Sequence, residues 1–273
     1  MEKLDPKLNA VPETMLWTLY SRAAEARRSD AVLHDPMSIR IYDSLAYDFR
    51  GSFGRPNPFA ALRALAFDDR LRRFLDEQGV KPVIVNLGEG LETQRYRVDA
   101  PDASWFTVDL PQAIAIRERF ISPDRTHRHL PISVTNHDWI AQIPPHRPTF
   151  ISAQGLFMYL KEREVRKIIE TIANTLENWS LMFDSVPLWL SQLSVLSGGL
   201  PLTRSYRVPP MPWGTNALLI KAQLRRWLGK NIDIELLSYP SYPRGAAYVF
   251  SRVVAGVPGS YLWAPPLVCV SRH

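Results

Sequence analysis

Val83-Ile84-Val85-Asn86-Leu87-Gly88-Glu89-Gly90 is the stretch that decides the fold. The run from Val83 to Leu87 is short and apolar, which is typical of a strand buried on both faces of a parallel sheet. Gly88 and Gly90 follow it directly. A glycine turn at the carboxyl end of such a strand lets a ligand approach the backbone closely, and the next helix offers unpaired N–H groups there. We therefore expect a nucleotide-like ligand at this turn.

The segments on both sides of this strand alternate between helix and strand patterns. Helices are predicted at 13–28, 58–78 and 111–120, and a strongly amphipathic helix carries Val165, Ile168, Ile169, Ile172 and Leu176 on one face. Further strands are predicted at 105–108, 132–134, 149–153 and 180–185. This alternation predicts an α/β fold with a doubly wound, mostly parallel sheet. Two last runs, 232–237 and 247–254, predict a terminal antiparallel hairpin.

The length of 273 residues suits one elaborated domain better than two independent ones. We divide it into an N-terminal helical part (1–80), a ligand-binding core (81–186), an inserted cap (187–230) and terminal strands (231–273). The cap is marked by aromatic residues, glycines and prolines, which interrupt the alternation. Connecting segments of this kind often carry function, so we expect the cap to contact the substrate.

Composition and charge exclude several classes of protein. The chain is 46% hydrophobic and 22% charged, as in a globular protein. Its start has no apolar signal region and no stretch is long enough to span a bilayer, so we expect no membrane partner. The single cysteine, Cys269, excludes an internal disulfide and fits a reducing, cytoplasmic compartment. The net charge of +6 suits an acidic ligand, but basic residues alternate with acidic ones between Asp68 and Glu77, so we expect no nucleic acid partner.

Asp109 lies 21 positions after Gly88, at the end of the second predicted strand. A carboxylate there can accept hydrogen bonds from both hydroxyls of a ribose, although the same residue could instead cap the helix that begins at Pro111. Thr93 stands where a dinucleotide fingerprint has its third glycine. The turn and the aspartate together therefore predict a nucleoside site, and they leave an NAD-linked oxidoreductase as the weaker alternative.

Three motifs are similar to those of one known family. Asn86-Leu87-Gly88-Glu89-Gly90-Leu91-Glu92-Thr93-Gln94 is similar to L-G-x-G-L-D-T-R, Val108-Asp109-Leu110-Pro111 to V-D-x-P, and Gln154-Gly155-Leu156-Phe157-Met158-Tyr159-Leu160 to E-G-x-x-x-Y-L. His34-Asp35-Pro36 and Asp138-Trp139 also fall where the family has similar residues. Over roughly 11–185, the chain resembles the leucine carboxyl methyltransferases, and among them the polyketide O-methyltransferases of the tetracenomycin type.

The resemblance implies a seven-stranded class I methyltransferase sheet with S-adenosylmethionine as cofactor and S-adenosylhomocysteine as product. It implies that the glycine turn faces the methionine part, that Asp109 holds the ribose and that Asp138 accepts from the adenine amino group, with Trp139 packed nearby. Two basic residues would clamp the cofactor carboxylate. The full set of implied cofactor residues is Arg22, Arg63, Gly88, Glu89, Gly90, Asp109, Leu110, Asn136, Asp138, Trp139 and Gln154.

Three positions depart from the family pattern. Gln154 replaces the usual Glu and so removes a negative charge expected near the cationic amino group of the cofactor. Gln94 replaces the usual Arg and Glu92 the usual Asp. The change at Gln154 predicts a weaker hydrogen bond to the cofactor, and the changes at Gln94 and Glu92 concern the ion pairing around the glycine turn rather than the fold.

The catalytic requirements depend on the acceptor. Methyl transfer depends mainly on alignment of acceptor, methyl carbon and sulfur. A carboxylate acceptor is already ionised at neutral pH, whereas a phenol would benefit from a base. His137 is the candidate base, and His127 and His129 are expected to be solvated in a polar loop. No histidine or carboxylate pair stands out as a base, which favours carboxyl methylation. The spacing of Asp30, His34 and Asp35 matches no metal cage, so no metal is expected.

The cap supplies candidate acceptor contacts. Trp189, Tyr206 and Trp213, together with Tyr159, could line an apolar pocket for a flat aromatic molecule, or they could form the core of the cap. The sequence thus predicts an O-methyltransferase that acts on a carboxyl or phenolic oxygen of a small aromatic or polyketide-like metabolite. The alternatives are a protein C-terminal carboxyl methyltransferase, an NAD-linked oxidoreductase, and a non-methylating protein that retains the cofactor-binding fold. The oligomeric state is not indicated.

Overall fold

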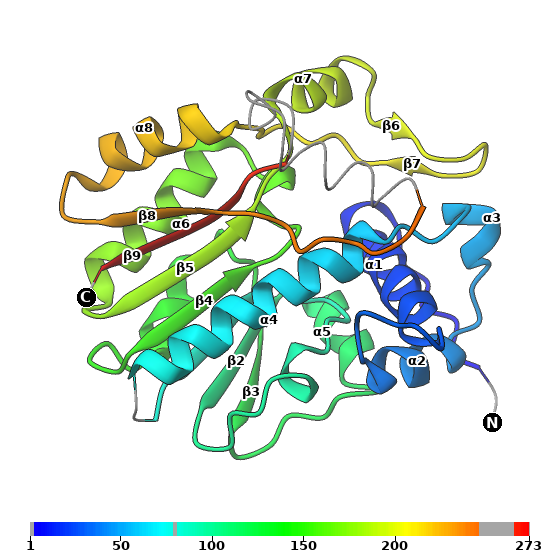
Figure 1. The fold of residues 1–273 in the computed structure, drawn as a ribbon, viewed down its shortest axis with the longest axis horizontal. Helices are drawn as coiled ribbons and strands as arrows, with labels where there is room; N and C mark the ends of the chain where they lie inside the picture. The colour runs from blue at the N-terminus through cyan, green and yellow to red at the C-terminus, as the bar shows by residue number, and fades with distance from the viewer. Residues whose placement is uncertain (1–2, 79–80, 246–264, 273) are drawn as a thin grey trace.

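The computed structural model describes residues 3–78, 81–245 and 265–272. In this part of the chain, seven strands form one sheet in the order β3-β2-β1-β4-β5-β9-β8 (Figure 1). The strands are β1 (Val83–Leu87), β2 (Ser104–Asp109), β3 (His127–Pro131), β4 (Thr149–Ala153), β5 (Trp179–Asp184), β8 (Asp233–Leu237) and β9 (Leu267–Arg272). β1 to β5 are parallel, whereas β9 runs antiparallel to both of its neighbours. This is a class I methyltransferase sheet, as predicted.

Helices cover both faces of the sheet, with α4 on one and α6 on the other (Figure 1). The N-terminal part contains α1 (Ala10–Ala26), α2 (Pro36–Asp43), α3 (Phe49–Phe53) and α4 (Phe59–Gln78). The core adds α5 (Pro111–Arg117), α6 (Glu162–Thr175) and three short 3-10 helices, η1 (Gln94–Tyr96), η2 (His137–Gln142) and η3 (Phe157–Tyr159). The cap contains α7 (Leu188–Leu196), the two-stranded sheet of β6 (Leu200–Pro201) and β7 (Arg207–Val208), and α8 (Ala217–Leu228).

Successive side chains of β1 point to opposite faces of the sheet, and both faces are apolar at this strand. Val83, Val85 and Leu87 belong to the hydrophobic cluster that contains the buried face of α6, whereas Ile84 belongs to the cluster of α4. All five residues of β1 are buried. The strand therefore lies in the middle of the fold, and the loop after it is held from both sides.

The prediction of a strand at 132–134 is wrong, because the strand is β3 (His127–Pro131). β3 is at the edge of the sheet and pairs only with β2 among the described strands. An edge strand needs fewer apolar residues, so its sequence carries a weak signal. The prediction that His127 and His129 are solvated is also wrong: His127 is 1% exposed and the His129 side chain also 1%.

The terminal strands differ in part from the prediction. β8 was predicted, and its antiparallel partner is β9, a strand that the sequence pattern did not single out. The predicted strand 247–254 lies outside the described residues. Within the described part of the chain, no helix combines the length and apolar character needed to cross a membrane.

Candidate functional site

A cavity of about 270 Å3 opens at the carboxyl ends of β1, β2 and β4. β1 lies between β2 and β4, where the strand order of the parallel sheet reverses, and open α/β sheets bind ligands in the crevice at such a point. Most of the predicted cofactor residues line this cavity. They are Arg22, Arg63, Gly88, Glu89, Gly90, Asp109, Leu110 and Gln154.

The glycine turn requires glycine at both positions. Gly88 has a φ of 61° and Gly90 a φ of 52°, a region that other residues rarely adopt. A Cβ on Gly88 would lie 2.7 Å from Cδ1 of Leu156, and a Cβ on Gly90 would lie 2.8 Å from Cβ of Met15 on α1. The turn thus packs directly against α1 and the loop after β4, and its backbone faces the cavity.

Asp109 closes the turn from the end of β2. Its Oδ2 accepts a hydrogen bond from the Gly90 N–H at 2.7 Å, and its Oδ1 accepts one from the Leu110 N–H at 2.7 Å. Burial raises the pKa of Asp109, although these two backbone bonds act in the opposite direction. A carboxylate offers about four acceptor sites, so each oxygen keeps one for a ligand.

Arg22 lies in a buried network behind the turn. It is 1% exposed, pairs with Glu92 at 2.9 Å and with Asp35 at 3.4 Å, and donates to the Leu91 carbonyl at 2.7 Å. Burial opposes ionisation of Glu92, but Arg22 and Arg97 outweigh it and lower the pKa to about 2. Arg22 is thus held in place while it still borders the cavity.

Gln154 lies beside Glu92, another departure from the family pattern on the cavity wall. Its Nε2 donates to Oε2 of Glu92 at 3.1 Å, and both residues line the cavity. The wall therefore keeps a carboxylate next to position 154 although the family's glutamate is absent there. Glu89 is held from the opposite side, because it pairs with Arg117 at 2.9 Å and accepts from Asn86 Nδ2 at 3.0 Å.

A second cavity of about 410 Å3 adjoins the first one. The two share Thr14, Thr18, Arg63, Gly155 and Tyr159 along their common border. The rest of the second cavity is mainly apolar, with walls from α1, α4 and the cap. Its described charged residues are Arg63 and Asp184, which form an ion pair at 3.0 Å.

The residues predicted around the adenine ring do not line the first cavity, unlike the other predicted cofactor residues. Asn136 and Asp138 are exposed and do not line the cavity; the Asn136 side chain accepts from the Asp138 N–H at 3.1 Å and caps η2. Trp139 is fully buried and donates to the Val134 carbonyl at 3.2 Å. Val134 and its neighbour Ser133, which the sequence did not single out, line the cavity instead.

The candidate base does not reach the site. His137 lines neither cavity, and burial together with nearby Lys167 lowers its pKa. No histidine is among the described lining residues of either cavity. Within the described part of the chain, a ligand in either cavity would therefore meet no histidine base.

Of the four cap-side aromatic residues, only Tyr159 lines a cavity. Trp189 is 47% exposed, and Trp213 is 2% exposed and packs against Phe183 with ring centroids 6.0 Å apart. Tyr206 packs edge-on against Phe53 at 4.8 Å. The prediction that these three line the pocket is therefore wrong. The second cavity is instead lined by residues that the sequence did not single out, among them Trp17, Leu190, Met211 and Tyr239, which share no motif and are brought together only by folding.

The sheet order, the glycine turn and Asp109 define a class I methyltransferase fold with a nucleoside-type site. A family model for leucine carboxyl methyltransferase matches residues 15–173, which is more than half of the chain. The chain belongs to the leucine carboxyl methyltransferase family. It is accordingly an S-adenosylmethionine-dependent methyltransferase, and not an NAD-linked oxidoreductase.

Two relatives illustrate the range of similarity. The tetracenomycin polyketide synthesis O-methyltransferase TcmP of Streptomyces glaucescens is 32% identical over 188 residues, which cover 67% of this chain and 68% of TcmP. A putative S-adenosyl-L-methionine-dependent methyltransferase of Parafrankia is 28% identical over 183 residues, with 59% of this chain and 58% of the relative covered. The chain thus matches less than two thirds of the length of the second relative.

Solved structures support the fold. A putative methyltransferase from Thermobifida fusca superimposes with a TM-score of 0.54 at 17% identity, covering 94% of this chain and 93% of that one. The plantazolicin methyltransferase BamL, crystallised with a triazolic desmethylPZN analogue and S-adenosylhomocysteine, gives a TM-score of 0.54 at 11% identity, covering 95% of this chain and 98% of that one. At these identities the likeness concerns the fold alone.

Proposed function

We propose that the protein transfers a methyl group from S-adenosylmethionine to a carboxyl oxygen of a small aromatic or polyketide-like acceptor. The observation that carries the proposal is the pair of adjoining cavities, which meet at Arg63, Gly155 and Tyr159. The first is built for a nucleoside and the second is larger and mainly apolar. TcmP, whose name describes a polyketide O-methyltransferase, supports the acceptor class.

The residues of the first cavity fit S-adenosylmethionine. Asp109 keeps free acceptor sites for the ribose hydroxyls, and the glycine turn allows close approach of the ligand to the backbone. Arg22 and Arg63 would hold the carboxylate, and Glu92 supplies negative charge for the amino group beside Gln154. When bound, the cofactor supplies a methyl group activated by a positively charged sulfur.

The second cavity fits a flat, mainly apolar acceptor. Its wall includes Leu190 and Met211 of the cap and Trp17 of α1, and Phe59 and Tyr239 add aromatic surface. Ligand pockets of this kind bind through apolar walls and orient the ligand through a few polar groups. The wall would hold the ring system so that one oxygen points to the border with the first cavity.

The polar groups at the border favour a carboxylate over a phenol. Asp184 is occupied, because it pairs with Arg63 at 3.0 Å and accepts from the Gly155 N–H at 2.6 Å. Burial raises the pKa of Tyr159 to about 12, so that its phenol stays protonated and can donate to an acceptor oxygen. With no free base among the described lining residues, an oxygen that is already ionised reacts without proton removal.

The proposal is tested with S-adenosylmethionine that carries an isotopic label in its methyl group. The full-length protein is incubated with a panel of polycyclic aromatic acids and with matched phenols that lack the carboxyl group. We expect labelled product from the acids and none, or much less, from the phenols. Labelled phenol ethers alone would move the activity to a phenolic oxygen, and calorimetry that shows no binding of S-adenosylhomocysteine would contradict the cofactor assignment.

A further inference from the structure

The cap carries the whole net positive charge of the protein. Residues 187–230 contain six basic residues and no aspartate or glutamate, which leaves 27 basic and 27 acidic residues in the rest of the chain. The net charge of +6 is therefore located in one segment. The six basic residues are Arg204, Arg207, Lys221, Arg225, Arg226 and Lys230.

These cations are exposed and are not paired with carboxylates. None of the six forms an ion pair within the part of the chain that the structure describes, although arginines of the core, such as Arg22, Arg63 and Arg117, are paired. Unpaired surface charge of one sign attracts a partner of the opposite sign. These six cations would therefore favour an anionic partner.

Exposed apolar side chains gather on the same part of the molecule. Eight large apolar residues of the described chain are strongly exposed, and seven of them lie on α7 and the first turn of α8. On α7, Leu196 is 86% exposed and Trp189 is 47% exposed; on α8, Leu218 is 60% exposed. Single exposed leucines are common, but a cluster of this kind marks a site of contact with an apolar phase or a partner.

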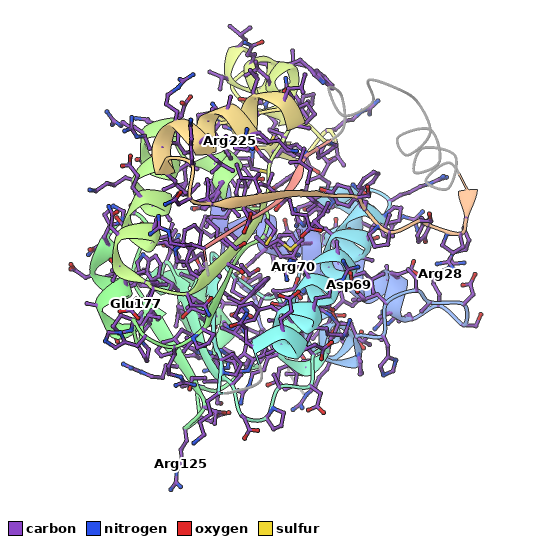
Figure 2. All side chains as sticks on the ribbon, turned by 60° about the vertical axis from the view of Figure 1, so that its left-hand side comes forward. Arg28, Asp69, Arg70, Arg125, Glu177 and Arg225 are labelled. Atoms are coloured by element: carbon purple, nitrogen blue, oxygen red, sulfur yellow. The ribbon has the colours of Figure 1, made fainter. Side chains whose placement is uncertain are left out.

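The two helices begin side by side. The Thr215 N–H donates to the Val186 carbonyl at 2.9 Å, so that the residues just before α8 lie against those just before α7. Figure 1 shows the two helices next to each other at the top of the molecule. Figure 2 shows Arg225 of α8 at the same end, whereas Arg125 projects from the opposite end. The exposed residues of α7 and α8, which we call the cap surface, therefore combine seven large apolar side chains with three of the six basic residues, Lys221, Arg225 and Arg226.

We infer that the cap surface binds the surface of an anionic lipid membrane. Leucine and tryptophan enter the interfacial region of a bilayer while lysine and arginine contact anionic head groups, a combination typical of proteins that lie on a membrane. Two copies of the cap surface would repel each other because neither has an acidic residue. The expectation of no membrane partner rests on the lack of a spanning segment, which binding to a membrane surface does not need.

The position of the cap surface connects it to the acceptor. α7 presents Leu190 to the second cavity and Leu193 and Leu196 to the outside, so one helix separates the apolar cavity from the proposed membrane contact. An acceptor with an apolar ring system partitions into lipid. The arrangement fits a protein that takes such an acceptor from a membrane surface. This uptake of the acceptor rests on the proposed function, whereas the binding of the cap surface to a membrane does not.

Vesicle binding tests the inference without cofactor or acceptor. Full-length protein is sedimented with vesicles of equal parts phosphatidylglycerol and phosphatidylcholine, and with vesicles of phosphatidylcholine alone. We expect binding to the anionic vesicles, little to the neutral ones, and loss of binding as the NaCl concentration rises from about 0.1 to about 0.5 M. Failure to bind anionic vesicles at low salt would overturn the inference.

Matched variants locate the contact. Arg225→Gln should weaken binding about fivefold, the effect of one charge at an anionic surface, while Arg125→Gln should leave it unchanged. Leu196→Ser should weaken it about tenfold, and Tyr96→Ser, which alters the eighth exposed apolar residue, should not. Equal loss in both members of either pair would overturn the inference. So would a protein dimer in sedimentation equilibrium that Leu196→Ser dissociates, because a second copy would then occupy the surface.

Discussion

Asp109→Asn tests the assignment of the ribose site. The substitution keeps the size of the side chain but replaces one carboxylate oxygen by an NH2 group and removes the charge. In the wild type, the two oxygens accept from the Gly90 and Leu110 N–H groups and each keeps a free acceptor site toward the cavity. The variant keeps one oxygen, so at most one ribose hydroxyl can still donate to it.

The expected loss follows from the number of hydrogen bonds. A hydrogen bond to a charged group contributes about 1.5–3 kcal/mol. Removing one of the two bonds to the ribose and weakening the other should cost about 2–4 kcal/mol, or about 30- to 1000-fold in affinity for S-adenosylhomocysteine. One backbone N–H also loses its acceptor, which should lower the free energy of unfolding by about 1–3 kcal/mol.

Calorimetric titration with S-adenosylhomocysteine measures the affinity, and chemical denaturation shows that the variant is folded. Asp102→Asn serves as a control because this exposed carboxylate lies in the loop before β2 and does not line the cavity. It should bind as the wild type does. A folded Asp109→Asn protein whose affinity stays within threefold of the wild type would refute the ribose assignment.

Three further predictions concern the support of the site. Gly90→Ala should lower the free energy of unfolding in denaturant by about 2–5 kcal/mol, because the added Cβ combines left-handed backbone strain with a close contact to Met15. The control Gly229→Ala has a φ of 82° and no atom within 4 Å of the added Cβ, so it should cost only the strain of about 1–2 kcal/mol. Equal losses in the two variants would contradict the close packing of the turn. Glu92→Gln should lower the free energy of unfolding by about 3 kcal/mol at pH 7, because the pKa of Glu92 falls from 4.5 to about 2 on folding. The difference in unfolding free energy between wild type and variant should shrink as the pH falls from 4.5 toward 2. A difference that does not depend on pH would reject the ion pairs of Glu92. Burial lowers the pKa of His127 from 6.5 to about 2, so below pH 6.5 the unfolded chain binds a proton that the native protein does not, and the free energy of unfolding falls as the pH falls. In His127→Gln this fall between about pH 6 and pH 4 should be smaller by about 1.4 kcal/mol per pH unit. The same pH dependence in variant and wild type would show that this histidine is protonated in the native state.

The central fold could be predicted because its signals are local. β1 is a continuous apolar run and α6 has apolar residues at helical spacing, so each pattern reports the burial of its own segment. The glycine turn and Asp109 also lie in fixed positions relative to these strands, and the structure brings them to one cavity. Their roles in cofactor binding remain predictions.

The parts that were missed depend on contacts between distant segments. β9 gains its place by entering the sheet between β5 and β8, and no pattern of its own indicates this. His127 looked polar and exposed, yet it is buried where its Nε2 lies 2.8 Å from the Thr107 hydroxyl. The orientation of Trp213 was equally open, since an aromatic residue fits a pocket wall and a core alike.

The distribution of the net charge along the chain could also be predicted only in part. Basic and acidic residues do alternate on α4, but this balance does not extend to the cap, where six basic residues have no acidic neighbour in the sequence from 187 to 230. A net charge taken over the whole chain conceals such a segment.

The most direct test of the central claim is the chemical nature of the product. After incubation with an aromatic acid and S-adenosylmethionine labelled in the methyl group, the product is treated with mild alkali, which hydrolyses methyl esters and leaves aryl methyl ethers intact. We predict that the label is released as methanol, because the proposed acceptor oxygen belongs to an ionised carboxyl group and the described lining residues of the two cavities offer no free base. Label that stays on the aromatic product would show ether formation and contradict the account.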